Sequence, residues 1–300
     1  MRLELKQFDL RRIRDNRIVL IIGPRGTGKS TLLFDILYNL CDRFDFGVAM
    51  SPTLESLIRF RQCFPGGFVF EDGYKIEQLR KMVHILRMLA AEGKPKRGLL
   101  VLDDCMADKK IFTGTEIRDL FYNGRHYNFT FVNCMQYMMD MTTDLRSQVD
   151  YLFVLNENIL ANKQRLHKYF FGQFTHFEDF NKVLETCTNN YECLVLDNTV
   201  KSNDPRDKLG FYKAREYTPK FRICRPVFWI LDHFYRKEKQ KQERLRPIWA
   251  TAREKIARAA EPVADPYNPR VQYVVKKKTN FAIQPPPPRR RPPSILASCD

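Results

Sequence analysis

The sequence predicts an α/β fold in which a mostly parallel β-sheet carries helices on both faces. Hydrophobic runs of about five residues alternate along the chain with segments of helical periodicity, as strand and helix do in such folds. The runs are continuously apolar, which is typical of strands that are buried on both faces. With 300 residues, of which 44% are hydrophobic, the chain is long enough for one main domain with appendages.

The first expected strand and helix flank residues 21–31, which read IIGPRGTGKST. The run RIVLII before the loop is rich in β-branched residues, and TLLFDILYNL after it repeats apolar residues at helical spacing. Between them the pattern G-x-x-x-x-G-K-[ST] is met, with glycines that let backbone N–H groups turn inward around an anion. The residues that meet it are Gly23, Gly26, Gly28, Lys29 and Ser30.

This loop is expected to hold the phosphates of a nucleotide at the positive end of the helix dipole. Lys29 would reach the β- and γ-phosphate oxygens, and the Ser30 hydroxyl would bind a magnesium ion. The sequence therefore predicts a magnesium-nucleotide site. The stretch expected to line it comprises Gly23, Pro24, Arg25, Gly26, Thr27, Gly28, Lys29, Ser30 and Thr31.

The remaining elements follow in chain order. FGVAMSP (46–52) predicts a second strand, and residues 52–97 combine a loop-rich stretch with a helix over 74–93 that ends at Gly93. Further buried strands are predicted at GLLVLDDC, FTFVNCMQY, YLFVLNE and YECLVLDN. Ligands of parallel sheets bind at the carboxyl ends of the strands, and the motifs found in this sequence lie there.

Two acids end the strand GLLVLDDC. Asp103 is placed to hold the magnesium ion through its water shell, and Asp104 to orient or deprotonate an attacking water. The alternative interpretation is an acidic pair that caps a helix at the entry of a loop. The sequence has no N-K-x-D motif, which a GTPase would need to recognise its base.

Three polar residues complete the candidate site. Gln136 ends the next strand and can hydrogen-bond both the γ-phosphate and the water, which would sense the bound nucleotide. Arg125 before this strand and Arg146 after it are candidates for an arginine finger that stabilises transition-state charge in a neighbouring subunit. The alternatives are a surface amide for Gln136 and solvated or structural roles for the arginines.

The net charge of +16 is concentrated in the last hundred residues. Residues 201–300 contain 24 of the 51 Lys and Arg residues but 10 of the 35 Asp and Glu residues, which indicates a polyanionic partner on the C-terminal side. We expect a P-loop domain over 1–230 and a charged helical extension over 231–261, with separate helices before and after Pro247. The basic, Pro-rich residues 262–300 are expected to be disordered or in polyproline II conformation.

Composition also argues against several classes of protein. No apolar run approaches the roughly 18 residues of a membrane helix, and the N-terminal residues lack the apolar core of a signal peptide. The eight cysteines form no C-x-x-C pair, and the five histidines show no metal-ligand spacing. We therefore expect a soluble, intracellular protein with reduced thiols, no membrane span and no structural zinc.

Taken together, the motifs resemble those of a known family. GPRGTGKS, LVLDDC, NGRHYNFTFVNCMQY, DLRSQVDYLFVLNEN and FGQFTHFEDFNKVLETCTNNYECLVLDN occur in this order. In order and spacing they are similar to the poxvirus-type genome-packaging ATPases of nucleocytoplasmic large DNA viruses, in the FtsK-HerA division of P-loop ATPases. The similarity covers roughly residues 10–230.

This resemblance implies a role for each motif. Residues 23–31 would be the Walker A motif, Asp103 and Asp104 the Walker B acids, and Gln136 the sensor glutamine. Arg125, or less well Arg146, would be the finger. Asp104 departs from the wider division, which has glutamate there, so that it would position water rather than act directly as the base.

The resemblance also implies a function. Such proteins are ATP-driven motors that form rings, typically hexamers, and translocate double-stranded DNA into a preformed capsid. Partners would be DNA, further copies of the chain, and capsid or portal proteins. The protein would act at the site of virion assembly in the cytoplasm or nucleus of an infected cell, and association with the virion is a further expectation. Three alternatives stay open: another FtsK-HerA translocase or helicase, a small-molecule P-loop kinase, and a nucleotide-bound scaffold.

Overall fold

The computed structural model describes residues 4–105, 111–112, 114–137, 141–202 and 204–259. The chain divides into two compact units, Met1–Glu238 and Lys239–Asp300. The expectation of a disordered tail over 262–300 lies outside the described residues.

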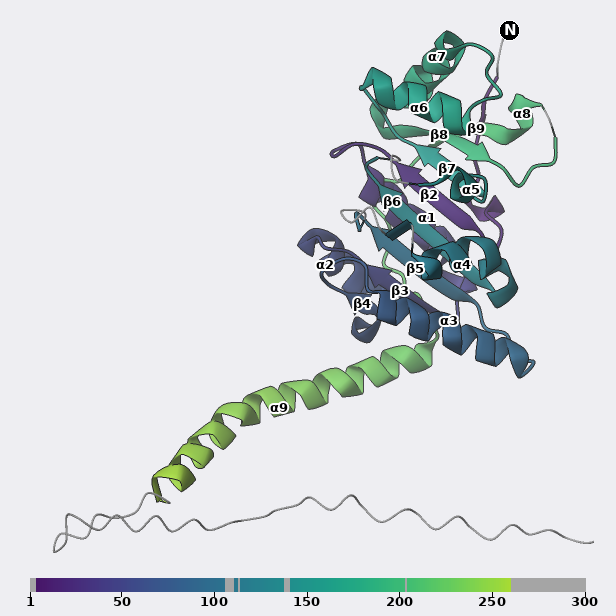
Figure 1. Cartoon of the computed structure of the whole chain (residues 1–300). Coiled ribbons are helices and arrows are strands. Elements are labelled where there is room, and N and C mark those ends of the chain that lie inside the picture. Colours follow the sequence, from purple (N-terminus) through teal and green to yellow (C-terminus); the bar gives the residue numbers. More distant parts are fainter. Residues whose placement is uncertain (1–3, 106–110, 113, 138–140, 203, 260–300) are drawn as a thin grey trace, which may run out of the picture. The chain divides into compact units, whose positions relative to one another are not determined.

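In the described residues, nine strands of the first unit form one sheet (Figure 1). Its order is β1-β9-β8-β7-β2-β6-β5-β3-β4. The pairs are parallel except those of β8 with β7 and β9, so the sheet is mostly parallel, as predicted. The strands are β1 Lys6–Gln7, β2 Ile18–Ile22, β3 Phe46–Met50, β4 Val69–Phe70, β5 Gly98–Asp103, β6 Phe129–Met135, β7 Tyr151–Val154, β8 Glu192–Asp197 and β9 Leu209–Lys213.

Helices connect these strands. They are α1 Lys29–Leu40, α2 Leu54–Cys63, α3 Ile76–Ala91, α4 Thr115–Asn123, α5 Thr143–Arg146, α6 Leu160–Phe170, α7 Phe177–Cys187, α8 Pro205–Lys208 and α9 Pro226–Ala259. The crossover through α1 runs from β2 towards β3, whereas the crossover through α4 runs back from β5 to β6. Because parallel crossovers are right-handed, α1 and α4 lie on opposite faces of the sheet.

The strands expected from apolar runs agree with the structure to within a few residues, because both faces of the sheet are covered. All five residues of β2 are buried, and so are the seven of β6. Strands β1 and β4 have two residues each, too few for a hydrophobic pattern, and β9 is a short strand that the sequence pattern did not single out. Helix α2 lies in the stretch that the sequence analysis expected to be rich in loops.

Helix α9 differs from expectation. Residues Pro226–Ala259 form one helix with Pro247 inside it, where we expected two helices separated at this proline. A proline within a helix removes one backbone hydrogen bond and strains the preceding turn. Strong helix formers, mainly Lys, Arg, Glu, Gln and Ala, stand on both sides, so the helix continues through the proline. The domain bounds 1–230, 231–261 and 262–300 stay predictions.

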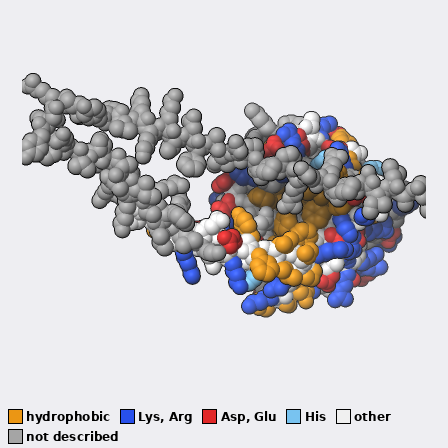
Figure 2. Space-filling model, turned by 90° about the horizontal axis from the view of Figure 1, so that it is seen from below, with side chains coloured by type: hydrophobic (Ala, Val, Ile, Leu, Met, Phe, Trp, Pro, Cys, Tyr) orange, Lys and Arg blue, Asp and Glu red, His pale blue; other side chains and the backbone are white. Residues whose placement is uncertain are grey.

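Apolar side chains are exposed where α9 begins. Figure 2 shows hydrophobic side chains gathered on the face of the first unit that is seen from below. On α9 the exposed apolar residues are Val227, Ile230, Leu231, Phe234 and Tyr235, and on α3 they include Ile85 and Met88. A cavity of about 510 Å³ with a mainly apolar lining lies between α3, β4 and the first turn of α9.

Candidate nucleotide-binding site

The loop between β2 and α1 has the backbone that the glycine pattern predicts. Gly26 and Gly28 have φ angles of +78° and +95°, which side chains rarely tolerate. Gly23 is required by space instead, since a Cβ atom there would lie 2.8 Å from the Thr27 Oγ1 atom and 2.9 Å from the Leu155 Cβ atom. The loop can therefore turn its backbone N–H groups towards one point at the start of α1.

Lys29 is the first residue of α1 and reaches back across the loop. Its Nζ atom donates to the Pro24 carbonyl oxygen at 2.8 Å, and the Thr27 hydroxyl donates to the same oxygen at 2.8 Å. Burial lowers the pKa of Lys29, and the nearby Asp103 and Asp104 oppose this shift. The ammonium group thus lies between the loop and the two acids.

Asp103, the last residue of β5, is 3% exposed. Burial raises the pKa of Asp103, whereas a hydrogen bond that Ser56 Oγ donates to Asp103 Oδ2 at 2.5 Å favours the ionised form. A cation beside this carboxylate would offset its burial. The Asp103 carboxylate and the Ser30 hydroxyl are oxygen ligands of the kind that magnesium prefers, so the residues present fit the ion.

The structure brings Gln136 and Asp104 together. Strand β6 pairs with β5 in parallel, with Asp103 opposite Cys134. Gln136 follows β6, and its Nε2 atom donates to both carboxylate oxygens of Asp104 at 2.9 Å. Asp104 has a φ angle of +54°, a conformation that turns its side chain away from the direction of the strand. Asp104 is less buried than Asp103, so one acid is enclosed and the other faces the outside with the glutamine.

A cavity of about 730 Å³ lies over the phosphate loop. It is lined by Gly26, Gly28, Lys29, Ser30, Thr31, Glu55, Arg59, Asn190, Tyr191, Lys213, Ala214 and Glu216. A second cavity of about 930 Å³ shares Arg59 and Glu216 with the first and extends to Phe34. The two cavities together are large enough for a nucleoside triphosphate.

The sequence analysis missed three residues of this site. Ser56 and Arg59 lie on α2, and Tyr191 precedes β8. Tyr191 is 69% exposed, has a φ angle of +63° and lies within contact distance of the space above Gly28. For α2, the apolar spacing of Leu57, Phe60 and Cys63 was an available signal. No local pattern marks Tyr191.

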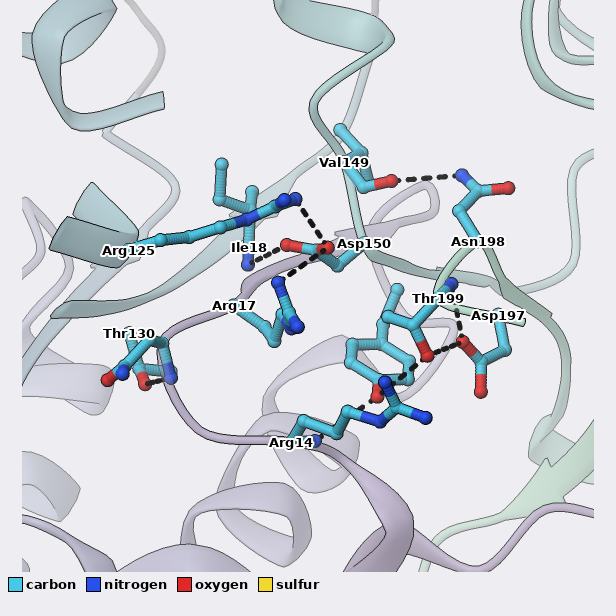
Figure 3. Close-up of polar contacts among 12 residues, drawn as sticks. Arg14, Arg17, Ile18, Arg125, Thr130, Val149, Asp150, Asp197, Asn198 and Thr199 are labelled. Carbon is cyan, nitrogen blue, oxygen red and sulfur yellow. Dashed lines mark hydrogen bonds and ion pairs between the residues drawn. The ribbon is translucent and has the colours of Figure 1, made fainter. Parts of the chain in front are cut away.

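The two finger candidates lie elsewhere. Arg125 lies in the short helix before β6, at the amino end of the sheet, and its side chain is 49% exposed. It donates to Asp150 Oδ1 at 2.7 Å, while Arg17 also points towards this buried carboxylate and the Ile18 N–H donates to it (Figure 3). The seven residues of β6 separate Arg125 from Gln136, a span of about 20 Å. Arg125 is thus remote from the phosphate loop of its own chain.

Arg146 ends α5 and is held within the chain. Its Nε atom donates to the Met141 carbonyl oxygen at 2.9 Å, and its guanidinium carbon lies 3.7 Å from the ring centre of Tyr169. Tyr169 and Gln136 line one cavity of about 240 Å³. Arg146 therefore packs against Tyr169, which lines the same cavity as Gln136.

Other features were searched within the described ranges. There, no group of three or more His, Cys, Asp and Glu residues has metal-binding geometry, and no helix is both long and apolar enough to cross a membrane. Seven cysteines lie in this part of the chain, all as free thiols and six of them buried. Cys299 falls outside it.

Comparisons with known proteins identify relatives in viruses, although no protein-family model matches the sequence. The uncharacterized protein L437 of Acanthamoeba polyphaga mimivirus is 32% identical over 225 residues, which are 71% of this chain and 78% of that protein. The uncharacterized protein 088R of Invertebrate iridescent virus 3 is 34% identical over 199 residues, or 65% and 75% of the two chains.

Solved structures share the fold. B204, the DNA-packaging ATPase from Sulfolobus Turreted Icosahedral Virus, has a TM-score of 0.51 at 15% identity, with 68% of this chain and 100% of that chain covered. The genome packaging NTPase B204 from Sulfolobus turreted icosahedral virus 2, in complex with ATP-gammaS, has a TM-score of 0.51 at 13% identity, with the same coverage. The predicted P-loop fold is confirmed.

Proposed function

This chain belongs to the family of the packaging ATPases of nucleocytoplasmic large DNA viruses, and we propose that it hydrolyses Mg-ATP to move double-stranded DNA into a preformed capsid. The contact of Gln136 with Asp104 beside the phosphate loop is the observation that carries this proposal. A glutamine that is hydrogen-bonded to Asp104 can change its contacts when a γ-phosphate is present. It can transmit this change to β6, the strand that it follows. A kinase would need an acceptor pocket at this place instead.

Each residue of the site has a distinct part in hydrolysis. The loop Gly23–Thr31 cradles the phosphates, and Lys29 neutralises the charge on the β- and γ-phosphate oxygens. Ser30 and Asp103 would hold the magnesium ion, which supplies further charge neutralisation when bound. Asp104 and Gln136 orient the attacking water, and Asp104 accepts its proton or directs it outward.

The geometry of Arg125 favours sites that are shared between subunits. Its chain places it at the opposite end of the sheet from its own phosphate loop, so it would act on a neighbour's nucleotide. A closed ring, which the family resemblance implies to be a hexamer, supplies such a neighbour for every subunit. Arg146 is the second candidate.

The partners follow from this assignment. The excess positive charge of residues 201–300 fits duplex DNA as the polyanion. Capsid or portal proteins would receive the DNA at the site of virion assembly, in the cytoplasm or nucleus of the infected cell. Another DNA translocase or helicase of the FtsK-HerA type would use the same site, and only the DNA and capsid partners would differ.

Hydrolysis measured against protein concentration and duplex DNA tests the proposal. Turnover per subunit should rise with both, because shared sites form only on assembly. Lys29→Ala should abolish turnover, since it removes the side-chain cation expected on the β- and γ-phosphates. Lys94→Ala changes an exposed lysine far from the loop in sequence and should leave turnover unchanged. Turnover that does not change with DNA or with protein concentration would favour a kinase or a scaffold. Negative-stain images with an ATP analogue and duplex DNA should show rings.

A further inference from the structure

Helix α2 forms a wall of the nucleotide cavity. Ser56 and Arg59 are three residues apart and therefore lie on the same side of this helix. Ser56 contacts the buried Asp103, so this side of α2 faces the carboxyl end of β5. Arg59 lines the cavity together with Lys29, Ser30 and Thr31. Arg59 is thus a further cation, besides Lys29 and Lys213, in the lining of the cavity that the phosphates would occupy.

The guanidinium of Arg59 makes no hydrogen bond or ion pair with a described residue, although the carboxylates of Glu55 and Asp103 are near enough to act on its charge. Its carbon lies 4.0 Å from the ring centre of Phe34, on α1, and no described carboxylate or carbonyl accepts a hydrogen bond from it. Its neighbour Arg61 on the same helix is ion-paired with Glu71. Stacking on Phe34 restricts the plane of the Arg59 guanidinium, and its N–H donors have no hydrogen-bond acceptor among the described residues.

The position of Arg59 beside helix α1 indicates which phosphate its N–H donors would contact. In the proposed site the β-phosphate would lie over the loop that ends at Lys29, and the γ-phosphate would face Asp104 and Gln136. The sugar end of the nucleotide must then leave past Thr31 towards Phe34, because the cavity extends in that direction. Arg59 lines both cavities and therefore lies beside this path.

We infer that Arg59 binds the α-phosphate of the nucleotide within the same subunit. Its fork of N–H groups would pair with the phosphate oxygens. Because Arg59 is partly buried, water would screen this ion pair less. Arg59 is thereby a binding residue that acts in the chain holding the nucleotide, unlike the finger that comes from a neighbour. The inference rests on the proposed nucleotide site at the phosphate loop.

The test measures binding of ATP, ADP, AMP and adenosine to the full-length chain by competition against a fluorescent ADP analogue. Arg59→Ala should weaken ATP, ADP and AMP alike, by roughly 10- to 100-fold, because all three carry the α-phosphate. Adenosine binding should not change. Arg59→Lys should recover part of the loss, since it keeps the charge but not the fork.

Arg61→Ala is the matched control and should bind all four compounds as the unmodified chain does. A loss confined to ATP would place Arg59 on the γ-phosphate and overturn the inference. An equal loss for adenosine, or a lowered unfolding temperature, would mean a structural role and overturn it as well. If the unmodified chain binds no nucleotide, the proposed function fails; if it binds and Arg59→Ala binds equally, only the role of Arg59 fails.

Discussion

At the scale of single residues, the two adjacent acids have different surroundings. Asp103 is enclosed and hydrogen-bonded by Ser56, while Asp104 is less buried and holds Gln136. Burial raises the pKa of Asp103, so its carboxylate gains most from a bound cation. Identical residue types at neighbouring positions are thereby suited to two tasks, one to the metal and one to the water.

Exchanging each acid for its amide should separate these tasks. Asp104→Asn should retain magnesium-dependent ATP binding but lose hydrolysis by about 100-fold or more, because the water loses the carboxylate that orients it or accepts its proton. Asp103→Asn should weaken the dependence of ATP binding on magnesium itself. Titration of magnesium at fixed ATP, alongside turnover, measures both effects. Identical behaviour of the two variants would contradict this division.

At the scale of elements, the phosphate loop is coupled to β7 through Gly23. A Cβ atom at this position would overlap Leu155, the residue that follows β7, as well as Thr27. Both contacts are too short for real side chains, and strand backbones cannot give way easily. The end of the neighbouring strand therefore leaves no room for a side chain at Gly23 in this conformation of the loop.

Gly23→Ala should lower the free energy of unfolding by about 1–3 kcal/mol through overpacking. It should also weaken nucleotide binding, since the loop must shift. Gly67→Ala is a suitable comparison: nothing lies within 4 Å of its added Cβ, and its φ angle is not positive, so its stability should stay within about 0.5 kcal/mol. Urea unfolding of the two variants gives the difference. Equal stability would mean that the loop does not depend on this contact.

At the scale of the whole molecule, the candidate residues lie at two opposite edges of one sheet. The phosphate loop, both acids and Gln136 lie at the carboxyl ends of the strands, whereas Arg125 lies at the amino ends and is ion-paired with Asp150. A finger at that end can serve only a second copy of the chain. The buried Asp150 carboxylate, with Arg17 beside it, fixes where the Arg125 side chain leaves the surface.

Mixing inactive variants tests the shared site. Arg125→Ala subunits should bind ATP yet fail to activate a neighbour, and Lys29→Ala subunits should carry an intact finger. Rings of both should recover part of the turnover at interfaces that pair an intact loop with an intact Arg125. Absence of recovery at every mixing ratio, in rings shown to be mixed, would move the assignment to Arg146.

The basic C-terminal residues offer a further test at this scale. Residues 262–300 contain seven Lys and Arg residues against Asp265 and Asp300. As a tether for DNA, each phosphate contact would add up to about −0.9 to the slope of log affinity against log salt. Removing residues 262–300 should flatten this slope and leave DNA-free ATPase activity intact. An unchanged slope would leave localisation or docking of a partner as the role.

Much of the fold and part of the site were determined by the sequence alone, because they depend on local physics. The phosphate loop is predicted by its glycines, its lysine and the helix that follows, and continuous apolar runs predict the buried strands. The contact of Gln136 with Asp104 depends in addition on the order of the strands. Strands β5 and β6 are paired in parallel, and the spacing of the two residues in the sequence does not show this.

Tertiary structure decided the rest, because distant segments meet only after packing. Ser56 and Arg59 reach the site because β3 lies beside β5, so that α2, which follows β3, comes against the end of β5. Tyr191 reaches the site because β8 runs antiparallel to β7, so that the start of β8 lies at the carboxyl end of β7. The side chain of Arg125 is held at the amino end of the sheet by Asp150, which is 25 residues away in the sequence. Asp150 is buried only once the sheet has formed around it. Such contacts join residues with no periodic relation, so no local pattern in the sequence can encode them.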